Sequence, residues 1–221
     1  YVSMGVSGGV DSTVASFLIH EAIKDRIYCV FIDQGLIRKN EVDEVKSAFK
    51  KFNFKHVYFV DASKLFLDRL KGITDPEQKR KIIAHTFIEV FEKKVKELER
   101  KNPKIRFLGQ GTIYPDRIET AQPSKQADKI KSHHNVALPK RMSLKVIEPL
   151  REFYKDGVRE LGIELKIPKE NVFRHPFPGP GLAIRILGEI TKERLDILRN
   201  ADYIFIEELK KSGYYDKVWQ A

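Results

Sequence analysis

The chain has 221 residues, of which 42% are hydrophobic and 33% are charged. This length and apolar content suffice for a buried core of one or two domains, and the high charge predicts strongly solvated helix faces. No apolar run approaches the roughly 18–20 residues of a membrane span, so we expect no membrane partner, and no signal peptide is visible.

The net charge of +10 could indicate a nucleic-acid-binding protein. However, the densest basic run, residues 93–101, falls at the end of a predicted helix, where cations complement the helix dipole. Aromatic residues are not interleaved with these bases. The run therefore indicates a solvated helix face, and we expect no nucleic-acid partner.

The single cysteine, Cys29, lies inside the apolar run 27–32. One cysteine cannot form an internal disulfide, and a lone cysteine within a strand is more often a core residue than a nucleophile. We therefore expect Cys29 to be buried, and we expect a reducing, cytoplasmic setting for the protein.

Short apolar segments alternate with helical patterns along the chain. The predicted strands cover residues 2–6, 26–33, 56–62, 105–110 and 144–148, and the predicted helices cover residues 12–24, 39–51, 76–100 and 152–166. Two strands contain near-continuous apolar runs, which is typical of strands buried on both faces of a parallel sheet. The alternation predicts a doubly wound α/β fold with a parallel five-stranded sheet, whose ligands bind at the carboxyl ends of the strands.

The long helix 76–100 begins at a capping box, Thr74 to Glu77, and its predicted buried stripe is Ile83, Phe87, Phe91, Val95 and Leu98. Residues 112–143 lack periodicity and predict a long loop, which in a compact domain is usually functional or disordered. A last helix begins at Thr191, with a predicted apolar stripe of Leu195, Leu198, Ala201, Phe205 and Leu209. We expect one domain over 1–172, and the incomplete beginning of a second domain over 173–221.

A Ser/Gly loop follows the first strand and leads directly into a helix. It reads Ser7, Gly8, Gly9, Val10, Asp11 and Ser12. Backbone N–H groups and the positive end of the helix dipole meet at such a loop, which suits a phosphate group. A carboxylate in this place is explained if Asp11 holds Mg²⁺ between itself and substrate phosphates. A Walker lysine is absent, so the loop is typical of one that holds pyrophosphate as a leaving group.

Further polar residues follow the fourth predicted strand. Asp116 and Glu119 lie three residues apart and could flank one reacting group, or they could be solvated carboxylates on a turn. Lys131, His133 and His134 could close over a polyphosphate and exclude water. Adjacent histidines could also indicate a metal site, but no Cys/His/Asp set with zinc spacing accompanies them.

These segments resemble the motifs of a known enzyme family. The loop 7–12 matches the S-G-G-x-D-S motif of the N-type ATP pyrophosphatases. LGQGT-YPD--E, IKSHHN, EPLREFYKD and RHPFPGPGLAIR follow in this order and resemble the ATP pyrophosphatase domain of GMP synthetases. The match extends from the first strand to the last residue, where YDKVWQA is similar to the early part of an α+β dimerisation domain. The implied fold is adenine nucleotide alpha hydrolase-like.

The resemblance implies a reaction and a set of site residues. ATP adenylylates XMP with release of pyrophosphate, and ammonia then displaces AMP to give GMP. The implied ATP-binding residues are Ser7, Gly8, Gly9, Val10, Asp11, Ser12, Ile32, Asp33 and Gly35, with Asp11 as the Mg²⁺ ligand. The implied catalytic residues are Asp116, Glu119, Lys131, His133 and His134, and the implied XMP-site residues are Arg80, Lys155 and Asp156.

The chain departs from the family pattern in two places. After the paired histidines, residues 136–139 are shorter than usual and lack glycine, and the remainder of the dimerisation domain does not follow residue 221. The chain also lacks a glutaminase, so ammonia must come from solution, from a fused glutamine amidotransferase domain or from a separate subunit. The resemblance further implies a homodimer formed through the C-terminal domain.

Two other functions share some of these features. A tRNA-modifying pyrophosphatase would have the same loop and a basic charge, but an enzyme of the thiolating kind needs further cysteines. A nucleotide-sensing domain without catalysis would not require Asp11, Asp116, Glu119 and Lys131 together. We therefore favour the amide-forming synthetase.

Overall fold

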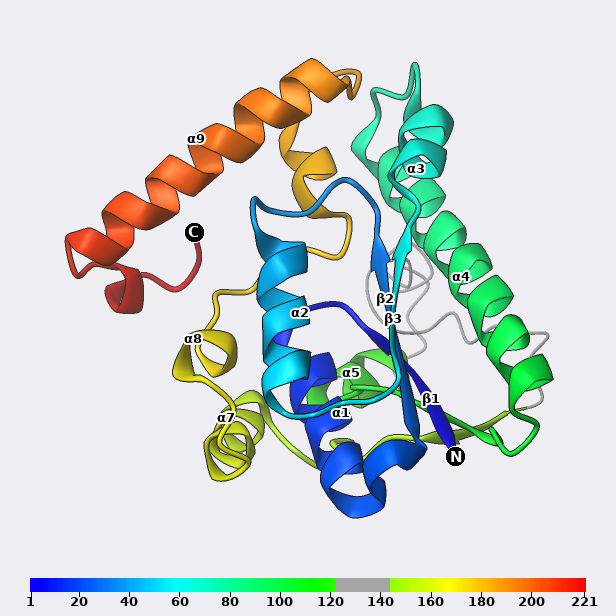
Figure 1. Ribbon diagram of the computed structural model, residues 1–221. Coiled ribbons are helices and arrows are strands. Elements are labelled where there is room, and N and C mark those ends of the chain that lie inside the picture. Colours follow the sequence, from blue (N-terminus) through cyan, green and yellow to red (C-terminus); the bar gives the residue numbers. More distant parts are fainter. Residues whose placement is uncertain (122–143) are drawn as a thin grey trace.

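The computed structural model describes residues 1–121 and 144–221, with the side chains of all these residues except 119–121 (Figure 1). The strands are β1 (Val2–Val6), β2 (Ile27–Asp33), β3 (Val57–Asp61), β4 (Phe107–Gly109) and β5 (Lys145–Ile147). The α-helices are α1 (Val10–Ile23), α2 (Glu41–Lys51), α3 (Ser63–Leu70), α4 (Pro76–Lys101), α5 (Tyr114–Ala121), α7 (Lys155–Glu164), α8 (Lys169–Val172) and α9 (Lys192–Lys211). Short 3-10 helices cover Lys24–Arg26, Gly181–Arg185 and Tyr215–Lys217.

The five strands form one parallel sheet in the order β3-β2-β1-β4-β5. The predicted doubly wound α/β fold is confirmed, and each predicted strand is present. The chain moves outward from β1 to β3 and then returns to the other side of β1 with β4. This reversal creates a switch point between the carboxyl ends of β1 and β4, where doubly wound sheets bind their ligands.

Helices cover both faces of the sheet (Figure 1). On one face, Val2, Met4 and Val6 of β1 pack against α1, α2, α7 and α8. On the other face, Val30 and Ile32 of β2 pack against α3, α4 and part of the C-terminal segment. Both faces of the central strands are covered by helices, which explains why the sequences of these strands are continuous apolar runs. Cys29 is fully buried in the first of these cores, as predicted.

Part of the segment 173–221 belongs to the second core. Leu182, Ala183, Ile186, Ile190 and Leu195 are buried in the same cluster as β2, α3 and α4. Hydrogen bonds also join this segment to α4. The Lys79 side chain of α4 is almost completely buried, and its ammonium donates to the carbonyls of Ile186 (2.7 Å) and Gly188 (2.6 Å). Burial lowers the pKa of Lys79.

Several local predictions were wrong. Residues 114–121 form helix α5 rather than the start of a loop, and helices α3 and α8 were not predicted at all. Helix α4 is capped by Asp75, whose carboxylate accepts the Gln78 N–H at 2.8 Å, rather than by Thr74. Asp75 precedes Pro76 directly, so proline takes the first helical position, where its missing N–H costs nothing.

The buried face of α9 also differs from the predicted stripe. Its buried residues are Leu195, Asp202 and Ile206, whereas Ala201 and Phe205 are exposed. The buried side of the helix runs through Asp202, whose carboxylate lies buried between Arg38 and Arg185. None of the helices that the structure describes is both long enough and apolar enough to cross a membrane.

Candidate active site

The loop between β1 and α1 is organised by its own hydroxyl groups. Ser12 Oγ donates to the Gly9 carbonyl (3.1 Å) and accepts the Ser7 N–H (3.2 Å). Ser7 Oγ lies 3.0 Å from Ser12 Oγ and accepts the Gly9 N–H at 3.3 Å. Gly8 has a φ of 77°, which glycine adopts without strain. The two hydroxyls and the start of α1 therefore face one spot at the carboxyl end of β1.

A second segment packs directly on this loop. A Cβ added to Gly111 would lie 2.9 Å from the Ser12 backbone nitrogen and 3.0 Å from the Asp11 carbonyl carbon. Only glycine allows the chain after β4 to approach the first turn of α1 so closely. The two segments on either side of the switch point are thus in contact, as the sheet order requires.

A third segment supplies the positive charge that the loop itself lacks. Lys155 is the first residue of α7, and its Nζ lies 2.8 Å from both carboxylate oxygens of Asp11. Both side chains remain about one third exposed. Lys155 and Asp11 are 144 positions apart in sequence, so only the fold brings them together. The pair occupies the place at which the sequence predicts a magnesium ligand.

The residues that follow β2 form a tight turn. The Asp33 carboxylate accepts the Gly35 N–H at 2.8 Å, and the Gly35 carbonyl accepts from Arg199 of α9 at 2.7 Å. Gly35 has a φ of 69°, and an added Cβ would lie 2.7 Å from Ser63 Cβ. Ile32 is buried beneath this turn. These residues lie at the carboxyl edge of the sheet, next to β1.

The remaining predicted residues are spread over several elements. On α5, the Asp116 carboxylate accepts the Ile113 N–H at 3.0 Å, which fixes the start of that helix. Arg80 forms an ion pair with Glu77 one turn earlier on α4. Asp156 is largely exposed and pairs with Arg159 at 3.4 Å rather than with a residue of the loop. The Glu119 side chain, and Lys131, His133 and His134 entirely, lie outside the described residues.

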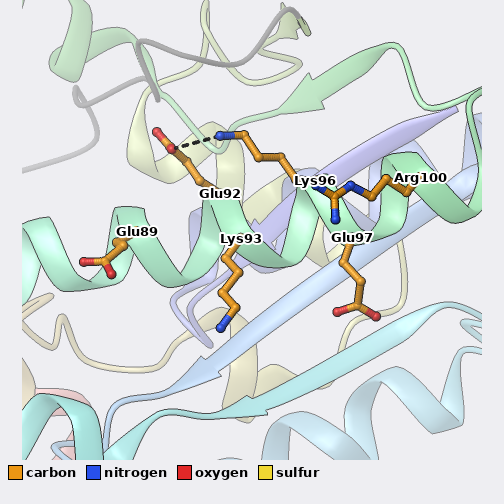
Figure 2. A pocket seen from close by; sticks show the side chains of 6 residues that line it. All are labelled: Glu89, Glu92, Lys93, Lys96, Glu97 and Arg100. Carbon is orange, nitrogen blue, oxygen red and sulfur yellow. Dashed lines mark ion pairs between the residues drawn. The ribbon is translucent and has the colours of Figure 1, made fainter.

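A pocket elsewhere on the surface does not coincide with this site. It is lined by Glu89, Glu92, Lys93, Lys96, Glu97 and Arg100, all from successive turns of α4 (Figure 2). Three carboxylates offset three cations there, and Lys96 pairs with Glu92 at 3.7 Å. This is a solvated helix face, as predicted for the basic run, and it does not form a basic patch.

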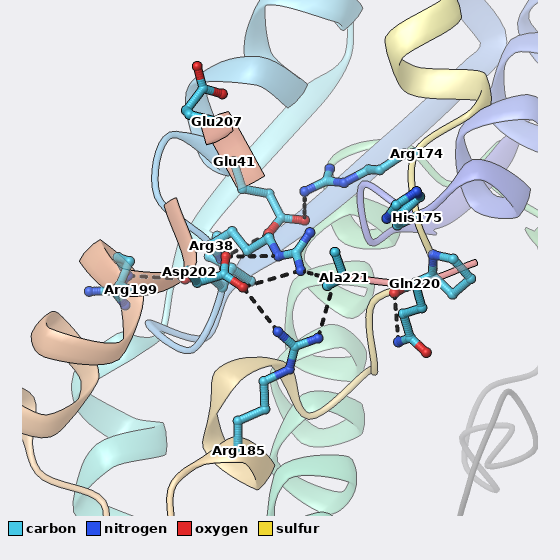
Figure 3. A network of polar contacts seen from close by, with 12 residues as sticks. Arg38, Glu41, Arg174, His175, Arg185, Arg199, Asp202, Glu207, Gln220 and Ala221 are labelled. Atoms are coloured by element: carbon cyan, nitrogen blue, oxygen red, sulfur yellow. Dashed lines mark hydrogen bonds and ion pairs between the residues drawn. The ribbon is translucent and has the colours of Figure 1, made fainter. Parts of the chain in front are cut away.

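Sequence reasoning missed a charged cluster behind the loop (Figure 3). Arg174 pairs with the buried Glu41 carboxylate (2.9 Å), and Arg38 and Arg185 both pair with the buried Asp202 carboxylate (3.1 and 3.0 Å). Burial raises the pKa of Glu41, an effect that Arg174 opposes. The RHPFPGPG motif, which includes Arg174, was a visible signal, but nothing in its sequence indicates the partner of the arginine.

Among the residues that the structure describes, no three Asp, Glu, His or Cys side chains gather as a metal site. The available donor is the Asp11 carboxylate, a partly exposed hard oxygen ligand within the loop 7–12. This fits Mg²⁺, because that ion is usually held by one or two carboxylates together with substrate phosphates. It does not fit a metal held entirely by protein ligands.

The sheet order and the loop at its switch point are those of the adenine nucleotide alpha hydrolase-like fold. An NMN synthetase from Francisella tularensis superposes with a TM-score of 0.59 at 14% identity, covering 90% of this chain and 84% of that one. An NH3-dependent NAD synthetase from Campylobacter jejuni has a TM-score of 0.54 at 12% identity, covering 96% and 77%. At such identities the similarity concerns the fold alone.

The sequence comparison is more specific. The chain is 57% identical over 219 residues to the glutamine-hydrolysing GMP synthase of Thermotoga petrophila, and 57% identical over 221 residues to that of Carboxydothermus hydrogenoformans. The predicted resemblance to GMP synthetases is thereby confirmed along the whole chain. The chain spans only 43% and 42% of the length of these two relatives. No protein-family model matches the chain.

Proposed function

We propose that this chain carries the ATP pyrophosphatase part of a GMP synthase. An oxygen of the XMP base attacks the α-phosphorus of ATP, the bond to pyrophosphate breaks, and adenylyl-XMP forms. Ammonia then displaces AMP and leaves GMP. The observation that supports this most directly is the hydroxyl-lined glycine loop at the switch point, paired with Asp11 and Lys155 and without a Walker lysine.

In this proposal the loop residues Ser7, Gly8, Gly9, Val10, Asp11 and Ser12 hold the β- and γ-phosphates. Backbone N–H groups at a helix N-terminus and two hydroxyls suit an anion that becomes more negative as pyrophosphate departs. The Asp11 carboxylate would hold Mg²⁺ together with the phosphates, and the ion would neutralise charge at the leaving group. Lys155 was predicted for the XMP site, but its Nζ lies at the Asp11 carboxylate, so in this proposal it would lie beside the phosphates instead.

The other proposed roles are those that the family resemblance implies. Ile32, Asp33 and Gly35 would hold the adenosine at the end of β2, and Asp116 and Glu119 would lie beside the reacting centre. Arg80 and Asp156 would contribute to the XMP site, Arg80 after release from Glu77. Lys131, His133 and His134 would close over the phosphates, and Lys131→Ala should lower kcat far more than it raises KM for ATP.

Ammonia has no source among these residues. The relatives are named glutamine-hydrolysing, and the chain spans less than half of their length, which supports a glutamine amidotransferase domain or subunit outside this segment. We further propose a synthetase domain, 1–172, and a dimerisation domain beginning at 173, whose first part, up to Leu195, packs on the core of the synthetase domain. The working form in this proposal is a cytoplasmic homodimer.

The test is an assay of the full protein with ATP, Mg²⁺, ammonium and XMP, with the products separated by mass spectrometry. We expect GMP, AMP and pyrophosphate in equal amounts. ADP and phosphate would exclude attack at the α-phosphorus. Tight, salt-sensitive tRNA binding without GMP formation would favour the tRNA-modifying alternative.

A further inference from the structure

An arginine behind the phosphate loop reaches the loop backbone itself. Arg174 Nη1 donates to the Gly8 carbonyl at 3.4 Å, and its Nη2 lies 2.9 Å from Glu41 Oε1. The Arg174 and Glu41 side chains are 13% and 4% exposed, so the pair is held away from solvent. Figure 3 shows the arginine approaching the first turn of α2, where Glu41 is located.

The two oxygens of Glu41 have separate partners. While Oε1 pairs with Arg174, Oε2 accepts the Arg38 N–H at 3.0 Å, which anchors the carboxylate to the backbone before α2. The guanidinium plane is thereby oriented by a rigid element. A planar group with several fixed donors can contact Glu41 and the Gly8 carbonyl at once, whereas a lysine ammonium presents a single point charge.

The contact matters because the Gly8–Gly9 peptide has two possible orientations. In a trans peptide the C=O and N–H groups point in opposite directions. Arg174 holds the Gly8 carbonyl on the α2 side, so the Gly9 N–H points to the opposite side, where it donates to Ser7 Oγ at 3.3 Å. A flipped peptide would present a carbonyl oxygen to the anion. Glycine, with access to both signs of φ, does not by itself prevent this flip.

We propose that Arg174, oriented by Glu41, is a positioning residue that fixes the Gly8–Gly9 peptide with its carbonyl away from the pyrophosphate site and its N–H on Ser7 Oγ, a hydroxyl of that site. This inference rests on the proposed function of the loop. It assigns a role to the arginine of the RHPFPGPG segment that does not require contact with the nucleotide. The close packing of the loop supports it, because a Cβ on Gly8 would lie 3.1 Å from Val45 and 3.2 Å from Glu41 Oε1.

The experiment measures binding of Mg²⁺-pyrophosphate by calorimetry, and KM for ATP and kcat, in the full protein and in Arg174→Lys, Arg174→Ala and Glu41→Gln. The matched control is Arg185→Ala, which also removes a guanidinium from a buried carboxylate but one that does not contact the loop. We expect both Arg174 variants to bind pyrophosphate about tenfold more weakly, the scale of one lost charged hydrogen bond. Glu41→Gln should show a smaller loss, and Arg185→Ala none.

Each outcome decides a separate point. The inference would be overturned if the Arg174→Lys protein has the urea midpoint of the wild type and also binds pyrophosphate with the affinity of the wild type. Equal losses of pyrophosphate binding in Arg174→Ala and Arg185→Ala would reduce the role of Arg174 to general stability, and would also overturn it. A wild-type protein that does not bind pyrophosphate would contradict the proposed function itself, whatever the variants show.

Discussion

Substitutions of Asp11 and Lys155 should affect stability and catalysis to very different extents. Both carboxylate oxygens of Asp11 lie 2.8 Å from the lysine Nζ, but the two side chains are 28% and 37% exposed. At such exposure an ion pair contributes at most about 1 kcal/mol to stability. Asp11→Asn should therefore reduce the free energy of unfolding by less than about 1 kcal/mol. Lys155→Gln should do the same.

The expected effect on catalysis is much larger. If the Asp11 carboxylate recruits the cation that neutralises departing pyrophosphate, its loss should lower kcat by on the order of 10²–10³. Urea unfolding followed by circular dichroism measures the first quantity, and XMP-dependent exchange of labelled pyrophosphate into ATP measures the second. Asp25→Asn is the matched control, because Asp25 pairs with Lys55 near the amino ends of β2 and β3, away from the loop.

Two results would refute this reasoning. Asp11→Asn with wild-type exchange at saturating Mg²⁺ would show that the carboxylate does not serve the cation. A loss of several kcal/mol in stability would show that the Asp11–Lys155 pair is a structural support, and that any loss of activity follows from damage to the fold. Asp25→Asn should leave exchange unchanged in either case.

Three further predictions concern single positions. Gly111→Ala should cost about 1–3 kcal/mol of stability and weaken ATP binding, because its Cβ would overlap the backbone of Ser12, whereas Gly179→Ala, with open space around it, should do neither in the same unfolding and binding assays. Cys29 is fully buried and its pKa is raised by burial, so a thiol reagent at pH 8 should label the native protein roughly a hundredfold or more slowly than the urea-unfolded protein; rapid native labelling would contradict this. The hydroxyl and N–H of Ser63 hold the pKa of Asp61 below its usual range. Stability from this contact is therefore present above the ordinary Asp pKa of about 3.9 and is lost as the pH falls through the lower folded-state pKa. Accordingly, Asp61→Asn should destabilise the protein at pH 7 and much less near pH 2, as measured by urea unfolding at both pH values.

Much of the fold could be predicted because its signals are local. A continuous apolar run such as 27–32 predicts a buried parallel strand without knowledge of its neighbours. The loop 7–12 is likewise a contiguous motif, and its hydroxyl contacts involve residues at most five positions apart. Short elements were missed for the same reason, since the eight residues of α3 have too few turns to establish a period.

The tertiary structure decided which distant residues meet. The order β3-β2-β1-β4-β5 places the ends of β1 and β4 side by side, and it brings Lys155 to Asp11 across 144 positions and Arg174 to Gly8 across 166. It also buried Asp202 of α9 between Arg38 and Arg185, against the apolar pattern of that helix. The spacing of apolar residues in the sequence indicates which face of each helix or strand is buried. The pairing of charges across elements depends on packing that no single segment specifies.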